Sequence, residues 1–275
     1  MYNSVMRFST LHCHTVYSDG KNTIDEMVRA AIGKNFGTIG FSDHGPITVP
    51  CSCNMKAEDF SSYRKEIREA AERYCSQINV RFGLECDWLK GCQPIAFYDA
   101  FPTDYRIGSV HFIRCGEEFV PIDKSRELQL EIIERYYNGD RYAMVLDYYS
   151  HVEEMTAAGG FDILGHIDLV CKFNENNALF DEESDLFEKP VSHILEAAAD
   201  NRIAVEINTG AIGRGYRSRP YPSPRILRLC AAHRLPIYLN SDAHTTASLD
   251  AGYADVVRYL KENGCPEDIV TDILF

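Results

Sequence analysis

Histidines and acids of the kinds that bind metal ions follow one apolar segment after another along this chain. Each segment has the length and aliphatic content of a buried strand, and the polar residues come where the segment ends. Residues near both ends of the chain can meet only if these strand ends share one rim, as in a β/α barrel. The set is His12, His14, Asp19, His44, Glu85, His111, His166, Asp242 and His244.

Strand and helix patterns alternate along the whole chain and predict seven strands, each followed by helix. The predicted strands are Met6–His12, Thr38–Ser42, Val80–Cys86, Tyr105–His111, Asp162–His166, Ile203–Asn208 and Ile237–Asn240. The first predicted helix begins at Thr23, and the others cover Glu58–Gln77, Ser125–Tyr137, Tyr142–Ala158, Asp185–Asn201, Pro224–Arg234 and Ala251–Asn263. We therefore expect an α/β fold, a distorted seven-stranded (β/α)7 barrel of the TIM type, with its active site at the C-terminal ends of the strands.

Local signals refine this expectation. The run from Thr23 to Glu26 has the pattern of a capping box, and Gly37 is placed to end the first helix. The irregular segments Gly45–Ala57, Leu89–Asp104 and Cys171–Ser184 follow strand ends, so we expect them on the rim that carries the site.

Length and charge limit the organisation and the partners. No linker or low-complexity tract divides the 275 residues, which predicts a single domain over 1–275. Lys and Arg number 28 against 41 Asp and Glu, a formal net charge of -13. That charge disfavours nucleic acid as a partner, because binding a polyanion needs clustered cations. A local cationic pocket could still capture a small anion, and the sequence leaves open whether copies of the chain form a homo-oligomer.

The ten cysteines do not predict a disulfide framework. The first residues show no apolar signal core and no segment reaches membrane-spanning length, so we expect a cytoplasmic protein with no membrane partner and with reduced thiols. Cys51 and Cys53 are expected to be loop residues. Apolar neighbours predict burial of Cys13, Cys86, Cys171 and Cys230.

The chemistry of the candidate ligands follows from their positions. Alternating residues of a strand point to one side, so His12 and His14 can reach one ion while Cys13 packs away from it. Asp242 and His244 repeat this spacing after the last strand. Glu85 lies in an apolar strand, where a carboxylate must be paired or metal-bound, and it can bridge two ions as an imidazole cannot.

Other readings exist for single residues. Asp19 precedes Gly20 and on its own is best read as a turn residue. His44, His111 and His166 could each be a structural histidine, but all three recur at the same kind of strand end. That recurrence favours metal ligation over separate structural roles.

These motifs together resemble the polymerase and histidinol phosphatase (PHP) family. The chain has, in the family's order, His-x-His with a following Ser-Asp-Gly, Asp-His, an isolated strand Glu, Gly-Ser-Val-His, Gly-His-Ile-Asp and Ser-Asp-Ala-His. The length, the stretch Asp104–Ile113 and the segment Glu206–Pro222 look most like the monofunctional histidinol-phosphate phosphatases.

The resemblance implies a trinuclear centre of divalent transition-metal ions. It suggests that His12, His14, Glu85 and Asp242 surround a first ion, that Glu85 bridges to a second ion held by His111 and His166, and that Asp19, His44 and His244 surround a third. Asp19 matches a position where some relatives have histidine. Nitrogen and oxygen donors suit zinc, iron or manganese and do not choose among them.

The implied activity is hydrolysis of L-histidinol phosphate to L-histidinol and phosphate in histidine biosynthesis, by attack of a metal-bridging hydroxide on phosphorus. Glu85 and Asp242 would serve catalysis through the ions. Arg214 is our first candidate for binding the phosphate, because it follows the sixth strand on the same rim. Further candidates are Lys172 and Arg217 for the phosphate, Asp168 or a metal-bound water as the acid for the leaving alcohol, and Asp87, Asp99 or Asp104 for the substrate's cationic groups.

Three alternatives stay open. A PHP-type phosphoesterase for nucleoside bisphosphates or short oligonucleotides would favour a more basic rim or an inserted domain, and neither is evident. An amidohydrolase-type barrel would add a carbamylated lysine at a strand end, and no predicted strand ends in lysine. A non-catalytic metal-binding scaffold module would be expected to have lost ligands.

Overall fold

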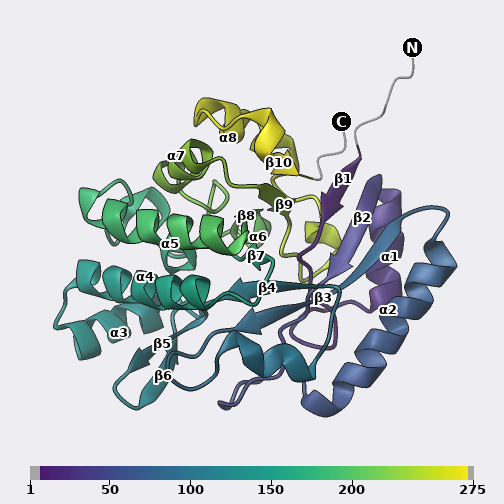
Figure 1. Ribbon diagram of the computed structural model, residues 1–275, viewed down its shortest axis with the longest axis horizontal. Coiled ribbons are helices and arrows are strands. Elements are labelled where there is room, and N and C mark those ends of the chain that lie inside the picture. The colour runs from purple at the N-terminus through teal and green to yellow at the C-terminus, as the bar shows by residue number, and fades with distance from the viewer. Residues whose placement is uncertain (1–6, 272–275) are drawn as a thin grey trace.

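The computed structural model describes residues 7–271 and shows a twisted parallel sheet rolled into a nearly closed barrel (Figure 1). Its strand order is β1-β2-β3-β4-β7-β8-β9-β10, and each neighbouring pair is parallel. The strands are β1 Phe8–Thr10, β2 Phe36–Phe41, β3 Asn79–Asp87, β4 Tyr105–Ser109, β7 Ile163–Leu164, β8 Ala204–Asn208, β9 Ile237–Asn240 and β10 Val270–Thr271. The first seven of these confirm the predicted fold class.

Several details differ from the expectation. The two-residue strand β10 was not predicted, and neither was the antiparallel hairpin of β5, Phe112–Cys115, with β6, Glu118–Pro121. Met6, expected to begin the first strand, lies outside the described residues. The fifth predicted strand is regular only over Ile163–Leu164. Short strands carry little periodicity of their own, so their limits depend on neighbours that are distant in the sequence.

The barrel closes beyond the ends of β1 and β9 rather than within them. Cys13 and Ala243 form an isolated parallel bridge, and the amide of His14 donates to the carbonyl of Ala243 at 2.9 Å. This closure sets the segment around His12 beside the segment around His244. Two motifs from opposite ends of the chain therefore share one edge of the barrel.

Helices lie around the outside of the barrel, with α1 and α2 on the right of the view and α3, α4, α5 and α7 on the left (Figure 1). Their bounds are α1 Ile24–Gly33, α2 Phe60–Tyr74, α3 Arg126–Tyr137, α4 Arg141–Ala158, α5 Glu188–Asn201, α6 Gly210–Gly213, α7 Pro224–His233 and α8 Tyr253–Glu262. Strand β3 is followed by a 3-10 helix, Ile95–Ala100, which lies within the segment Leu89–Asp104 that was expected to be irregular.

The first helix shows one correct and one wrong prediction. The amide of Glu26 donates to the hydroxyl of Thr23 and the amide of Thr23 donates to the carboxylate of Glu26, so the capping box is confirmed. The helix ends at Gly33, before Gly37, and Asn35 takes the left-handed conformation there with φ 62°. Asparagine tolerates this conformation, and Gly37 belongs to β2 instead.

The cysteines follow the prediction with one exception. Burial is confirmed for Cys13, Cys86, Cys171 and Cys230. Cys51 and Cys53 were expected to be free thiols but form a disulfide in the loop after β2. None of the helices over 7–271 combines the length and the apolar composition that a membrane span requires.

Candidate metal centre

Glu85, near the end of β3, lies at the centre of the site and is fully buried. Its Oε2 is 2.9 Å from Nδ1 of His44 and 3.3 Å from Nε2 of His12. Its Oε1 is 3.0 Å from Nε2 of His166 and 3.5 Å from Nε2 of His111. Nε2 of His14 is 3.5 Å from Oε2 as well. One carboxylate therefore faces imidazoles contributed from beyond four different strands, three on one oxygen and two on the other.

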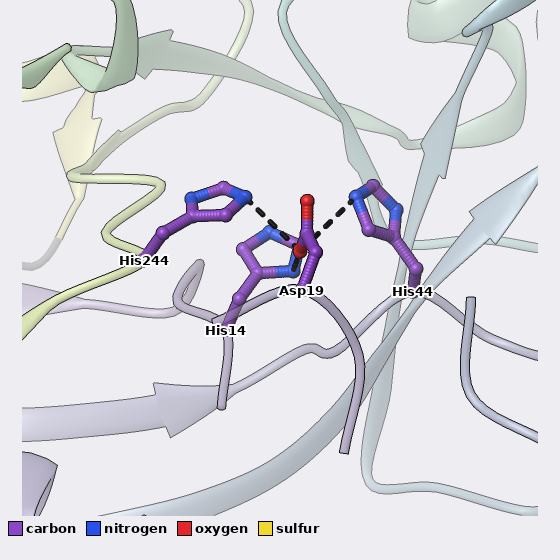
Figure 2. A group of neighbouring side chains, drawn as sticks. All are labelled: His14, Asp19, His44 and His244. Carbon is purple, nitrogen blue, oxygen red and sulfur yellow. Dashed lines mark ion pairs between the residues drawn. The ribbon is translucent and has the colours of Figure 1, made fainter. Parts of the chain in front are cut away.

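A second cluster surrounds Asp19, which reaches in from the turn after His14. Figure 2 shows three imidazoles directed at its carboxylate. Asp19 Oδ1 is 3.2 Å from Nε2 of His244, 3.6 Å from Nδ1 of His14 and 3.8 Å from Nε2 of His44. The neighbouring Gly20 allows this turn, since a Cβ there would lie 2.5 Å from the backbone of His14. Asp19 is thus part of the cluster and not only a turn residue.

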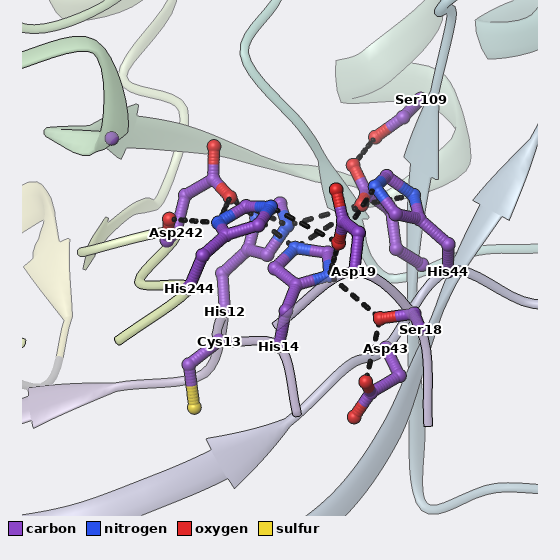
Figure 3. A network of polar contacts seen from close by, with 12 residues as sticks. His12, Cys13, His14, Ser18, Asp19, Asp43, His44, Ser109, Asp242 and His244 are labelled. Atoms are coloured by element: carbon purple, nitrogen blue, oxygen red, sulfur yellow. Dashed lines mark hydrogen bonds and ion pairs between the residues drawn. The ribbon is translucent and has the colours of Figure 1, made fainter. Parts of the chain in front are cut away.

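Asp242 lies between the two clusters and contacts a histidine of each. Its Oδ1 is 3.2 Å from Nε2 of His14 and 3.8 Å from Nε2 of His12 (Figure 3). Asp242 lies beyond β9 and has a left-handed backbone, with φ 46°. This backbone conformation directs its carboxylate into the site, whereas the sequence pattern predicted the alternation of an extended strand. The prediction that Cys13 packs away is confirmed, because its sulfur lies 3.1 Å from the carbonyl of Gly40.

The donors fit divalent cations. Within 7–271, the ligand atoms of three groups each lie within 4.8 Å of one another: His14, Asp19, His44 and His244; His12, His14 and Glu85; His44, Glu85 and His111. Buried polar atoms normally have hydrogen-bond partners, yet several ligand atoms here make no hydrogen bond. They are Nε2 of His12, Nε2 of His14, Nδ1 of His44 and Oε2 of Glu85. Cations bound between these atoms would satisfy them.

The charges of the cluster also suit cations. Burial by itself would raise the pKa of Glu85, but His12, His44 and His111 outweigh it and hold that pKa well below its usual range. Burial, reinforced by two neighbouring imidazoles, lowers the pKa of His14 to about 3, so this ring is neutral as a ligand must be. Burial opposes the protonation of His44, but Glu85 and Asp19 raise its pKa to about 10. A metal ion on His44 would therefore displace a proton.

Two buried carboxylates lie behind the histidines: Glu206 was not predicted, and Asp87 was predicted only as a candidate for the substrate's cationic groups. Glu206 of β8 accepts from Nδ1 of His12 at 2.7 Å, and Asp87 of β3 accepts from Nδ1 of His111 at 2.6 Å. Each contact orients a ring and leaves its Nε2 directed at Glu85. The argument used for Glu85 would have found Glu206, since it too is an acid within an apolar strand.

Of the three predicted phosphate-binding cations, Arg214 and Lys172 line the cavity at the candidate metal cluster, and this cavity has a volume of about 130 Å³. Arg214 donates to Asp242 Oδ2 at 3.0 Å and to the carbonyl of Asp242 at 3.3 Å, and its Nε makes no hydrogen bond. Gly210 permits this contact, because a Cβ there would lie 2.6 Å from Asp242 Oδ2.

The structure does not bring Arg217 to this cavity. It is buried and forms a two-pronged pair with Glu182 at 2.8 and 3.0 Å. Asp168, a candidate acid, is likewise absent from the residues that line the cavity, and it accepts a hydrogen bond from the amide of Ser223 at 2.7 Å. Burial raises the pKa of Asp168 to about 6. Arg217 and Asp168 therefore connect loops beside the site through these contacts.

Comparison with known proteins gives relatives over most of the chain. A probable histidinol-phosphatase of Deinococcus radiodurans is 29% identical over 263 residues, covering 92% of each chain. The protein hisK of Listeria monocytogenes shares the fold with a TM-score of 0.81 at 24% identity, over 90% of this chain and 98% of that one. A histidinol phosphate phosphatase of Lactococcus lactis, whose structure holds Zn, L-histidinol and phosphate, has a TM-score of 0.70 at 20% identity, covering 94% and 95%.

The site and the fold agree with a match to a family. Residues 10–210 match the PHP domain, and this range contains most of the clustered histidines and acids described above. Asp242 and His244 lie beyond the matched range but join the same cluster through His14 and Asp19. The chain therefore belongs to the PHP domain family.

Proposed function

We propose that this protein is a metal-dependent phosphomonoesterase that hydrolyses L-histidinol phosphate to L-histidinol and phosphate. The observation that carries the proposal is a set of adjoining metal-binding groups, which share His14, His44 and Glu85 and open onto a cavity that also holds Arg214 and Lys172. The relatives named above support histidinol phosphate as the substrate.

The proposal includes three divalent ions, as zinc, iron or manganese. One would be held by His12, His14, Glu85 and Asp242, a second by Glu85, His111 and His166, and a third by Asp19, His44 and His244. Purified protein loaded with metal should retain close to three ions per chain, because each set supplies at least three donors. Elemental analysis that finds one ion or none after loading would contradict the trinuclear assignment.

Bound divalent ions supply a more acidic water as the nucleophile and neutralise the charge of the phosphoryl group. The chain's own residues would place the substrate. Arg214 lines the cavity, where Asp242 and His244 hold its guanidinium, and a guanidinium can offer parallel donors to phosphate. Lys172 donates to the carbonyl and to Oδ2 of Asp123 at 2.7 and 3.0 Å, which leaves one of its three hydrogens for a phosphate oxygen. Arg217 is excluded from this proposal by its pairing with Glu182.

An assay over a panel of small phosphomonoesters, with added Mn or Zn, tests the substrate assignment. We expect a rate concentrated on L-histidinol phosphate. A faster rate on nucleoside 3′,5′-bisphosphates would replace the proposal with the nucleotide alternative, and no rate on any ester in the metal-loaded protein would favour a scaffold role.

We also propose that residues 1–275 act as one PHP-type metallophosphoesterase domain, in the cytoplasm and without a nucleic-acid partner. The net charge of -13 supports the last point, since a polyanion would need clustered cations.

A further inference from the structure

A second cavity, of about 520 Å³, adjoins the candidate metal cluster and is large enough for the alcohol part of a phosphate ester. The two cavities share residues, among them His111, Asp123 and Lys172, so they meet where a phosphate on the metal cluster would join its alcohol. The outer cavity is walled on one side by Phe112 and Phe119 of the β5–β6 hairpin. These rings give an apolar surface on which a planar group can pack.

The rim acids considered from the sequence do not offer a free carboxylate to this cavity. Asp87 lines it, but its two oxygens accept from His111 and from Asn54. Asp99 pairs with Arg106 at 2.8 Å and does not line the cavity. Asp104 lines a different cavity at the opposite end of the barrel, between the starts of the strands. Each acid that the sequence offered for binding a cation therefore either has both oxygens paired already or lies away from this cavity.

Asp123 remains, and it was not singled out by the sequence. It follows β6 and lines both cavities, and its side chain is 24% exposed. Lys172 binds its Oδ2 and its carbonyl, whereas its Oδ1 accepts no hydrogen bond from any residue of 7–271. The third acid of this cavity, Asp19, is already directed at the imidazoles of the metal cluster. Asp123 thus offers a carboxylate oxygen that has no partner among the described residues and that belongs to no candidate metal-binding group, unlike the carboxylate of Asp19.

We propose that Asp123 is the residue that selects the alcohol: its Oδ1 binds a cationic nitrogen of the leaving group, while Lys172 on its other oxygen holds it at the junction of the two cavities. The protein would then favour phosphomonoesters whose alcohol carries an ammonium or imidazolium close to the ester oxygen. This inference rests on the proposed phosphomonoesterase function and adds the residue that determines its specificity.

The test compares L-histidinol phosphate with phenyl phosphate, whose alcohol has a ring and no positive charge. Asp123→Asn keeps the shape of the side chain and removes its charge. We expect kcat/KM for L-histidinol phosphate to fall about ten- to a hundredfold, mainly through KM, which is the range for one hydrogen bond between charged groups. The value for phenyl phosphate should fall much less, so that the ratio of the two substrates drops by about tenfold or more.

A matched control removes one negative charge from the same hairpin without touching the cavity. Glu117 between β5 and β6 is 95% exposed at its side chain, so Glu117→Gln should leave the substrate ratio unchanged. Equal losses on both esters in Asp123→Asn would show that Asp123 only positions Lys172, and would overturn the proposal. Asp123→Glu, which restores the charge, should recover part of the preference.

The outcome also separates this inference from the proposed function. If the unaltered protein hydrolyses phenyl phosphate as well as L-histidinol phosphate, the substrate assignment itself fails, and the specificity role fails with it. If the unaltered protein prefers L-histidinol phosphate and Asp123→Asn keeps that preference, the proposed function stands and only the role of Asp123 is refuted.

Discussion

Replacing Glu206 by glutamine tests whether a buried carboxylate behind the histidines sets the metal affinity. Four donors converge on this side chain. Nδ1 of His12 and Nδ2 of Asn240 meet its Oε1 at 2.7 and 2.9 Å. The amide of His166 and Nδ2 of Asn208 meet its Oε2, both at 2.9 Å. A glutamine amide has one oxygen, which accepts, and one NH2 group, which only donates. In either orientation the NH2 group would face two of these four donors and could accept a hydrogen bond from neither.

The magnitude follows from those contacts. Loss of an orienting partner behind a metal ligand typically costs about 10- to 100-fold in metal affinity or activity. Leaving two buried donors unpaired should also cost at least about 2 kcal/mol of folding free energy. For a chain of 275 residues this lowers the Tm by roughly 3–4 °C. We therefore expect Glu206→Gln to fold, to melt slightly earlier and to bind metal about 10- to 100-fold more weakly.

The assay is competition for zinc between the protein and a chromophoric chelator, with a thermal melt of the metal-free protein alongside. Glu182→Gln is the matched control, because Glu182 is also buried but accepts from Arg217, Arg219 and Asn174 and from no candidate ligand. It should lose stability without losing metal affinity. A Glu206→Gln protein that binds zinc within twofold of the unaltered protein would refute the orienting role.

Three further predictions concern residues in the site or beside it. Glu85→Gln should lower kcat far more than Asp19→Asn at matched metal content, because Glu85 faces imidazoles on both of its oxygens; equal losses would contradict this division. Arg214→Ala should lower kcat/KM for L-histidinol phosphate about ten- to a hundredfold, with Arg214→Lys restoring only part, and unchanged kinetics would remove it from the phosphate site. Arg217→Met should lower the free energy of unfolding by about 3 kcal/mol in a denaturant titration, because it removes a charged partner of the buried Glu182. The folded variant should keep the KM of the unaltered protein, and a raised KM with unchanged stability would make Arg217 a substrate-binding residue again.

The sequence by itself determined the barrel and which histidines and acids meet at one rim. Apolar runs of strand length mark where each strand ends, and parallel β/α units bring those ends to one rim whatever the loops do. His12, Glu85 and His166 could therefore be grouped without knowing any distance between them. The same logic applies to Glu206, an acid within an apolar strand, whose carboxylate accepts from Nδ1 of His12.

Only the tertiary structure decided which charges are free to act. Arg214 and Arg217 look alike in the sequence, yet one lines the cavity and the other is held by Glu182. Asp123 became a candidate because an unpredicted hairpin carries it to the junction of two cavities, where one of its oxygens stays unpaired. Strand ends follow from local pattern and a general rule of topology. The pairing of a charged side chain depends instead on which distant residue lies within about 3 Å, and local pattern carries no information on that.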